Sequence, residues 1–195
     1  MKYYLLDYEK DESYALLTDE IDGFDYGYKF FEEVSIKNEW PNNTSIGFSD
    51  SNPQGINLTD FVNNVMAFLI VSDEIKTIVE GEACSGLEFL PIKILNHKHR
   101  IASDTYWVIN IIKQIECVDR DKSDFDEDIV DPDLIEGFRK LVLKDDMDKI
   151  QESIFRMKEQ PRFIVFSENL VNKLKEKNVT GAVFHETQTI TSFGL

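Results

Sequence analysis

The sequence predicts an α+β fold, with a mixed sheet in which two similar strand–helix–strand units flank a hairpin and an acidic loop. The first observation behind this prediction is that residues 68–89 resemble residues 163–184 in the same register. Each segment starts with apolar, β-favouring residues that end at a serine, and continues with a helical pattern and a second apolar run. The other two observations are a pair of strand-like runs around a basic turn, and a dense run of carboxylates.

The N-terminal part is expected to hold one strand followed mainly by loops. The apolar segment 2–8 predicts the first strand. Asp-Gly, Trp-Pro and Asn-Pro turn signals then recur, so residues 9–56 should hold only one or two short strands. Because no Pro-rich or Gly/Ser-rich linker interrupts the chain, we predict a single domain over residues 1–195, with 1–56 as its loop-rich N-terminal part. Residues 57–68 fit either a strand or a helix.

In both repeated units a serine stands where the strand meets the helix. Ser72 and Ser167 can each accept a backbone N–H there, as an N-cap residue does. Acidic residues follow both serines, where the helix dipole favours negative charge. Apolar residues at helical spacing, beginning with Ile75 and Leu170, then give each helix one face to bury. If the flanking strands pair in parallel, the connection through each helix should be right-handed.

The region between the two units is expected to contain the hairpin. Residues 86–95 and 104–112 are typical of its two strands, and the basic segment 96–100 is typical of its turn. Residues 114–118 are expected to extend the same sheet. Further along, Asp131-Pro132 predicts a helix start, with Asp as the N-cap and Pro at the first helical position. The remaining expected elements are strands at 139–144 and 162–166, and a helix, or a helix passing into a strand, at 147–156.

The net charge of −16 is the strongest compositional feature. A field of this sign repels nucleic acid and speeds association with basic partners, although an acidic surface can also serve solubility alone. The longest apolar run, residues 65–71, is too short to span a bilayer. Asp7 and Glu9 interrupt the first apolar residues before a signal peptide can form. We therefore expect a cytoplasmic protein without nucleic-acid or membrane partners.

The sequence contains no recognisable cofactor or metal motif. Cys84 and Cys117 are too few for a disulfide framework or a four-cysteine metal site. The acidic run opens at Asp119 like a calcium-binding loop, but Asp124 stands where a glycine is needed and Val130 where a bidentate Glu is needed. Gly-rich phosphate loops, H-E-x-x-H and paired C-x-x-C motifs are also missing. We therefore predict no cofactor and no metal.

Candidates for catalysis are few. His185 stands beside Glu186 and can act as an acid or base. Ser72 and Ser167 occupy strand–helix junctions, where a hydrolase nucleophile can lie, but neither has the glycines of a G-x-S-x-G motif. We predict that the protein is not an enzyme. A small cytoplasmic enzyme of the hydrolase type is kept as an alternative.

A series of short motifs runs through residues 57–187. They are Ser72-Asp73-Glu74-Ile75, Gly86 to Ile92, Tyr106 to Asn110, Cys117-Val118-Asp119 with Ser123, Ile154-Phe155-Arg156, Phe166-Ser167-Glu168 and Thr180-Gly181. In their order and spacing they resemble the bacterial polymorphic-toxin immunity proteins of the eleventh numbered immunity family, formerly a domain of unknown function. The N-terminal stretch is similar to that family only loosely.

The resemblance implies a small cytoplasmic protein that is encoded beside a secreted toxin, binds its cognate toxin domain and neutralises it by stoichiometric occlusion. Many toxins of this kind are basic nucleases, and a carboxylate-rich surface can cover a basic active-site face. The resemblance supplies no catalytic residues. An acidic regulatory adaptor is a further alternative, and the oligomeric state is not predicted.

The acidic run and the hairpin supply the candidate toxin contacts. Four carboxylates and one possible aromatic anchor are predicted: Asp119, Asp121, Asp124, Asp126 and Trp107. Arg156 is expected to pair with a carboxylate from the acidic loop. The binding surface is therefore expected between the two repeated units, at residues 96–133.

Overall fold

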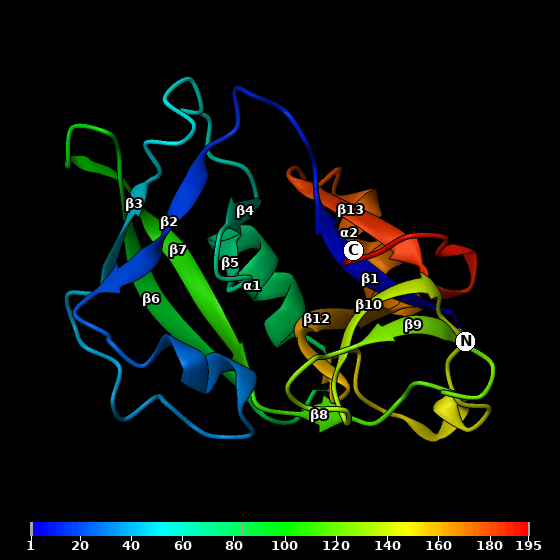
Figure 1. The fold of residues 1–195 in the computed structure, drawn as a ribbon. Coiled ribbons are helices and arrows are strands. Elements are labelled where there is room, and N and C mark those ends of the chain that lie inside the picture. Colours follow the sequence, from blue (N-terminus) through cyan, green and yellow to red (C-terminus); the bar gives the residue numbers. More distant parts are fainter. Residues whose placement is uncertain (1, 83, 195) are drawn as a thin grey trace.

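The computed structural model describes residues 2–82 and 84–194 and arranges the strands in three sheets (Figure 1). A closed barrel has the strand order β2-β3-β6-β7-β5-β4, and a five-stranded sheet has the order β13-β1-β12-β11-β8. A third, two-stranded sheet is formed by β10 and β9. The α+β class is confirmed, but the single mixed sheet that we expected is wrong, because the pairings that close the barrel join strands far apart in the sequence.

The elements have the following bounds. The barrel strands are β2 (Leu16–Asp22), β3 (Ser45–Phe48), β4 (Phe61–Asn64), β5 (Leu69–Ser72), β6 (Leu87–Leu95) and β7 (Ile101–Ile111). The strands of the five-stranded sheet are β1 (Tyr3–Tyr8), β8 (Gln114–Ile115), β11 (Ile154–Met157), β12 (Gln160–Ser167) and β13 (Ala182–Glu186). The two-stranded sheet consists of β9 (Asp124–Glu127) and β10 (Ile135–Lys140). The helices are α1 (Asp73–Glu80) and α2 (Glu168–Glu176), and 3-10 turns lie at η1 (Gly27–Phe31), η2 (Met147–Lys149) and η3 (Thr187–Thr189).

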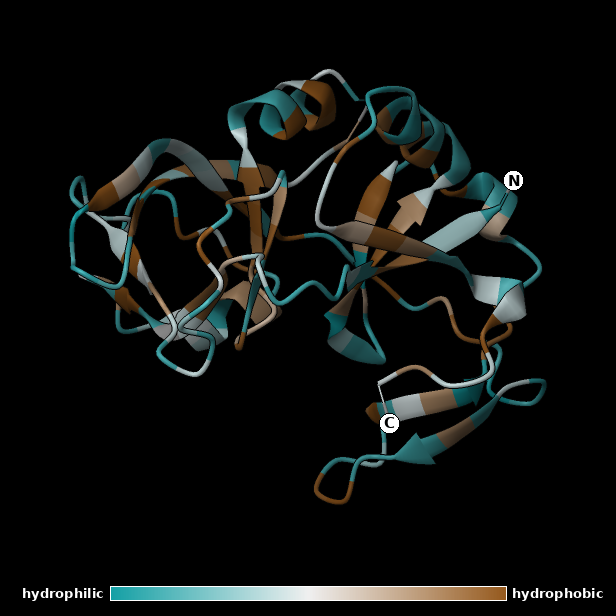
Figure 2. Cartoon of the chain, turned by 90° about the horizontal axis from the view of Figure 1, so that it is seen from above, coloured by the Kyte–Doolittle hydropathy of each residue, from teal (hydrophilic) through white to brown (hydrophobic). Residues whose placement is uncertain are grey.

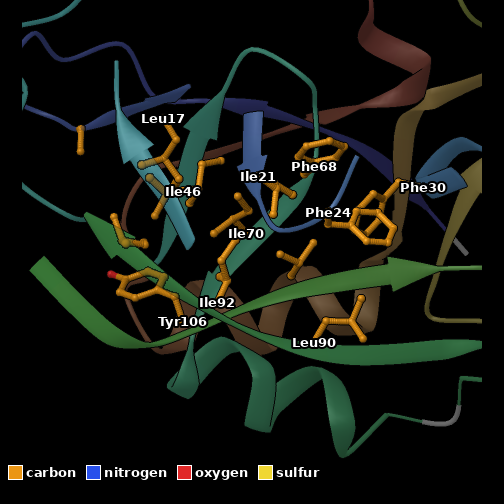
Figure 3. Close-up of a cluster of buried hydrophobic side chains, with 14 of the residues drawn as sticks. Leu17, Ile21, Phe24, Phe30, Ile46, Phe68, Ile70, Leu90, Ile92 and Tyr106 are labelled. Atoms are coloured by element: carbon orange, nitrogen blue, oxygen red, sulfur yellow. The ribbon is translucent and has the colours of Figure 1, made fainter. Parts of the chain in front are cut away.

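Alternating side chains fill the barrel. On β6, Leu90, Ile92 and Ile94 are buried inside it, while the residues between them are more exposed. Figure 3 shows Ile92 next to Ile70, in one cluster with Leu90 and with the rings of Phe24 and Phe30 from the segment between β2 and β3. The period of two in this strand is therefore what places one row of side chains in the barrel interior.

A second cluster of buried side chains lies between the barrel, the two helices and the five-stranded sheet. It contains Val71 of the barrel, Ile75 of α1, Leu170 of α2 and Phe166 of the sheet, each of them fully buried. The helices α1 and α2 contact each other, and Figure 2 shows them side by side. Burial of each such side chain contributes roughly 1.5–3 kcal/mol, so this shared cluster is a main source of cohesion between barrel and sheet.

The strands that flank each helix run in the same direction but do not pair with each other. In the barrel, β7 lies between β5 and β6 and is antiparallel to both. In the five-stranded sheet, β1 lies between β12 and β13 and is antiparallel to both. The chain thus passes through β5, α1 and β6, and again through β12, α2 and β13, in two different sheets. Whether these two segments are copies of one unit stays a prediction.

Several local predictions can be compared with the structure. The hairpin is confirmed, since β6 pairs with β7 around a turn at residues 96–100. The expectation for residues 114–118 is wrong, because β8 pairs with β11 in the five-stranded sheet and does not extend the hairpin. Residues 57–68 contain the strand β4, residues 139–144 hold only the end of β10, and residues 147–156 contain η2 and the start of β11.

The predicted helix start at Asp131-Pro132 is also wrong. The Asp131 carboxylate accepts a hydrogen bond from the backbone N–H of Asp133, and the strand β10 follows at Ile135. The Asp side chain therefore closes a turn here, which is the other structure that an Asp-Pro sequence favours. Residues 9–56 contain β2, β3 and η1 among loops, and the division of the chain into domains stays a prediction. Among the described residues, no helix has the length and apolar character needed to cross a membrane.

Candidate functional site

The acidic run forms a two-stranded hairpin that is attached to the five-stranded sheet. We call residues 119–140 the acidic ribbon; it comprises the turn at 119–123, β9, a connecting loop at 128–134 and β10. Phe138 of β10 is fully buried, and its ring lies 6.2 Å from that of Phe163 on β12 and 6.4 Å from that of Phe125 on β9. Figure 2 shows the ribbon projecting beside the C-terminus. Its aromatic side is thus held by the sheet, and its charged side chains face outward.

Two of the candidate carboxylates, Asp124 and Asp126, are held together by Arg139. The Arg139 guanidinium donates to Asp124 Oδ1 over 3.0 Å and to both oxygens of Asp126 over 2.7 Å. These hydrogen bonds lower the pKa of Asp126, because they stabilise its charged form. The planar Arg139 guanidinium fixes the positions of the Asp124 and Asp126 carboxylates and neutralises part of their negative charge. The structure therefore brings Asp124 and Asp126 together, and the positive group between them is the Arg139 side chain of the same ribbon.

Asp119 and Asp121 lie in the turn that leads into the ribbon. The Asp119 carboxylate accepts from the backbone N–H of Lys122 and lies 2.8 Å from Lys122 Nζ. The side-chain hydrogen bond from Lys122 lowers the pKa of Asp119. Asp121 is exposed, and no ion pair joins it to another described residue. Asp119 thus shapes the turn, whereas Asp121 presents its charge to solvent.

Trp107, the candidate aromatic anchor, has its contacts elsewhere. It lies on β7 of the barrel, and its indole Nε1 donates to Asp73 Oδ1 of α1 over 2.9 Å. The Lys76 ammonium of the same helix lies 5.1 Å from the centre of its ring. The Trp107 side chain is half-buried against the cluster shared by barrel and helices. Its contacts therefore join β7 to α1, and its role as a toxin contact stays a prediction.

The most exposed apolar side chains of the ribbon were not among the residues predicted from the sequence. Ile129 and Val130 lie in the loop between β9 and β10 and are 96% and 91% exposed. Figure 2 shows a hydrophobic stretch in this loop, at the end of the ribbon. The sequence signal for this exposed pair is two aliphatic residues with carboxylates on both sides. We expected a helix to start directly after them, at Asp131-Pro132, and did not consider the pair as part of the surface.

The loop is held in shape by its own carboxylates and by Arg120. Asp128 Oδ1 accepts from the backbone N–H groups of Val130 and Asp131 over 2.8 and 3.0 Å. These backbone hydrogen bonds lower the pKa of Asp128. The Arg120 guanidinium donates to the backbone oxygens of Pro132 and Asp133. Polar contacts thus order the loop while its two aliphatic side chains remain exposed.

The residues considered for catalysis have structural partners. His185 Nε2 lies 3.5 Å from Asp7 Oδ2, whereas Glu186 pairs with Lys2. Ser167 Oγ accepts from the Leu170 N–H and caps α2 as expected. Among residues 2–82 and 84–194, no three His, Cys, Asp or Glu side chains are grouped so that they could hold a metal ion.

The expectation for Ser72 is wrong in its detail. Ser72 occupies the N-cap position of α1, but its side chain does not accept a backbone hydrogen bond of the helix. It donates instead to Asp60 Oδ1 over 2.9 Å. Because the Asp60 carboxylate is ionised, this hydrogen bond is stronger than one between neutral groups. This serine therefore ties the strand–helix junction to the segment before β4.

The expectation that Arg156 pairs with the acidic loop is also wrong. Arg156 is fully buried on β11, and its Nη1 donates to the backbone oxygen of Pro161 over 2.6 Å. Its guanidinium carbon lies 5.2 Å from the ring centre of Phe31 in η1. Burial lowers the pKa of Arg156 to about 10, because the charged form loses its hydration. The position of β11 within the sheet directs this side chain toward the barrel and away from the ribbon.

The comparisons with known proteins agree with the resemblance seen in the motifs. The chain matches the family described as the immunity protein family Imm11 over residues 5–189, which is nearly its whole length. No sequence among the curated proteins matches it significantly. The match extends through the N-terminal strands, which the motifs alone had linked to the family only loosely. The chain therefore belongs to the Imm11 family of immunity proteins.

Proposed function

We propose that this protein neutralises a cognate toxin domain by binding it stoichiometrically, with the acidic ribbon as the main contact surface. Membership of an immunity protein family supports the role in toxin immunity. The observation that carries the choice of surface is the exposed, ordered ribbon with its excess of carboxylates. The proposed contacts are those predicted from the sequence: Asp119, Asp121, Asp124 and Asp126 of the ribbon, with Trp107 as a separate contact beside α1.

The charge of the protein supports a basic partner. At −16, the chain attracts positively charged surfaces over several ångströms and accelerates encounter with them. A basic nuclease domain has such a surface, because it must bind phosphate groups. The ribbon would cover that surface and exclude the substrate. This mode of action requires neither a cofactor nor a catalytic residue, and the proposed place of action is the cytoplasm, where a nuclease toxin meets its substrate.

Growth rescue tests this function. The toxin domain encoded by the adjacent gene would be expressed in a sensitive strain with and without this protein. Full rescue is expected when the two proteins are produced in equal amounts, and none when this protein is absent. Replacement of Asp121, Asp124 and Asp126 by Asn should weaken the rescue, because it removes charge from the ribbon.

A matched control separates the effect of losing ribbon carboxylates from the effect of lowering the total negative charge of the protein. Asp25→Asn with Glu32→Gln and Glu33→Gln removes three exposed carboxylates from the segments on either side of η1, outside the ribbon. This control variant should rescue as well as the wild type. Full rescue by the wild type at strongly sub-stoichiometric amounts would contradict occlusion and would favour an enzyme. The absence of any rescue would contradict the immunity function itself.

A further inference from the structure

The loop at residues 128–134, which we call the tip, combines exposed aliphatic side chains with a defined backbone. Ile129 and Val130 are the two most exposed large apolar residues among those described, at 96% and 91%. An apolar pair this exposed gains nothing in the free protein, and it gains free energy as soon as a partner removes it from water. Scattered single apolar residues on a surface need no explanation, but two adjacent ones at the end of a projecting hairpin form a patch.

The backbone of the tip is already ordered without a partner. The Asp128 carboxylate accepts from two backbone N–H groups within the loop, and Asp131 accepts from the Asp133 N–H. Arg120 reaches across to the backbone oxygens of Pro132 and Asp133. Binding therefore does not have to order this loop, and less of the binding free energy is lost to conformational entropy.

The charges around the tip differ from those at the base of the ribbon. At the base, Arg139 engages Asp124 and Asp126. Around the tip, no ion pair with another described residue is recorded for any of four carboxylates: Glu127, Asp128, Asp131 and Asp133. Arg120 brings one positive charge to the tip through the backbone oxygens of Pro132 and Asp133, so the four carboxylates leave a net negative charge around the exposed aliphatic pair. A partner surface that complements this arrangement has an apolar centre and a positive rim.

We infer that Ile129 and Val130 are the anchor of the toxin complex and insert into an apolar pocket on the toxin domain that is rimmed by Lys and Arg. The inference rests on the proposed function and specifies the contact that it uses. The carboxylates of the tip steer the encounter and set its rate, and the aliphatic pair slows dissociation. Trp107 does not take part in this contact. The end of the ribbon thus presents an exposed aliphatic pair that is surrounded by carboxylates.

Association and dissociation kinetics separate the two roles. The probe is the purified toxin domain encoded by the adjacent gene, immobilised and exposed to the full-length protein. Ile129→Ser with Val130→Ser should raise the dissociation rate by roughly 10- to 100-fold and leave the association rate nearly unchanged. Glu127→Gln with Asp133→Asn should lower the association rate and its salt dependence, with a smaller effect on dissociation.

Two matched variants make the test specific. Ile101→Ser alters another exposed aliphatic residue, 59% exposed at the start of β7, and should leave both rates unchanged. Val130→Ile keeps the tip apolar and should retain slow dissociation. Because the tip side chains are almost fully exposed, thermal unfolding of the serine variant should match that of the wild type.

The outcomes distinguish this inference from the function on which it rests. If the serine variant dissociates as slowly as the wild type, the tip is not the anchor, although the immunity function stands. If only the carboxylate variant dissociates faster, the contact is electrostatic and the inference is wrong. If the wild-type protein does not bind the toxin domain at all, the proposed function fails before the anchor is tested.

Discussion

Asp60 and Thr180 are 120 residues apart in the sequence and are joined by three hydrogen bonds. Asp60 Oδ2 accepts from the backbone N–H of Thr180 over 2.9 Å and from its hydroxyl over 2.8 Å. The Asp60 N–H donates to the same hydroxyl over 3.0 Å. Asp60 also accepts from Ser72, so one carboxylate links the barrel, the start of α1 and the segment before β13. Asp60 thus links the motif that begins at Ser72 to the motif Thr180-Gly181, and both motifs carry the family resemblance.

Loss of the Asp60 hydrogen bonds to Ser72 and Thr180 should destabilise the fold. Asp60→Ala removes the acceptor for both Ser72 and Thr180, and we expect it to lower the free energy of unfolding by roughly 1–3 kcal/mol. Urea unfolding followed by circular dichroism measures the change. Asp121→Asn is the control, because the exposed Asp121 has no recorded partner among the described residues, and it should change stability by less than about 0.5 kcal/mol. If Asp60→Ala changes the free energy of unfolding as little as Asp121→Asn does, the Asp60 hydrogen bonds do not stabilise the fold.

Gly181 should tolerate no side chain. Its φ is +81°, and a Cβ there would lie 2.3 Å from the backbone oxygen of Phe61 and 2.4 Å from Thr59 Oγ1. Gly181→Ala therefore adds a clash to a backbone conformation that costs an L residue about 1–2 kcal/mol. Gly86→Ala is the matched comparison, since φ is +70° but the nearest atoms are 3.5 Å away. Thermal unfolding should show a much larger loss for Gly181→Ala, and equal losses would contradict the close approach.

Glu88 should make stability depend on acid pH. Burial on β6 opposes its charged form, but hydrogen bonds from Ser35, Asn110 and the Ile36 N–H outweigh that effect and lower its pKa below 4.5. A carboxyl whose pKa is lower in the folded state stabilises the protein above its unfolded pKa, and this contribution is lost as pH falls through the folded pKa. The wild type should therefore lose stability below pH 4.5 more steeply than Glu88→Gln does. Parallel pH profiles of the unfolding free energy for the two proteins would refute this role.

Arg156 should be replaceable by an apolar residue of similar length. It is fully buried, it donates to Pro161 through Nη1, and its Nε and Nη2 have no acceptor among the described residues. Arg156→Met removes the cost of burying a charge and keeps the volume, so it should lower stability by less than about 1 kcal/mol or raise it. Arg156→Ala leaves a cavity and should cost about 2–3 kcal/mol. An equally large loss in both variants would mean that the charge itself stabilises the fold.

Local patterns in the sequence predicted much of the secondary structure. The first strand, the hairpin of β6 and β7 and both helices follow from the period of apolar residues and from polar residues at their ends. Ile75 and Leu170, which begin the predicted apolar faces, are both fully buried. Closure of the barrel was not predictable in this way, because β2 pairs with β4 and β3 with β6 across long stretches of chain. Single-residue patterns do not encode which distant strands meet.

The candidate surface was predictable in composition but not in arrangement. The carboxylates of the ribbon are visible in the sequence, whereas the position of Arg139 between Asp124 and Asp126 depends on how β9 and β10 pair. Ile129 and Val130 look like core residues in the sequence, but both are exposed in the loop between β9 and β10. The single domain over residues 1–195 stays a prediction, and it implies one cooperative transition when unfolding is followed in urea.

Calorimetric titration tests the central claim most directly. The toxin domain of the adjacent gene would be titrated with this protein at low and at high salt. We predict a one-to-one complex whose affinity falls with added salt, and a clear loss of affinity when Asp121, Glu127 and Asp133 are replaced by their amides. An unchanged affinity of this amide variant, or the absence of a complex with the wild type, would contradict neutralisation by the acidic ribbon.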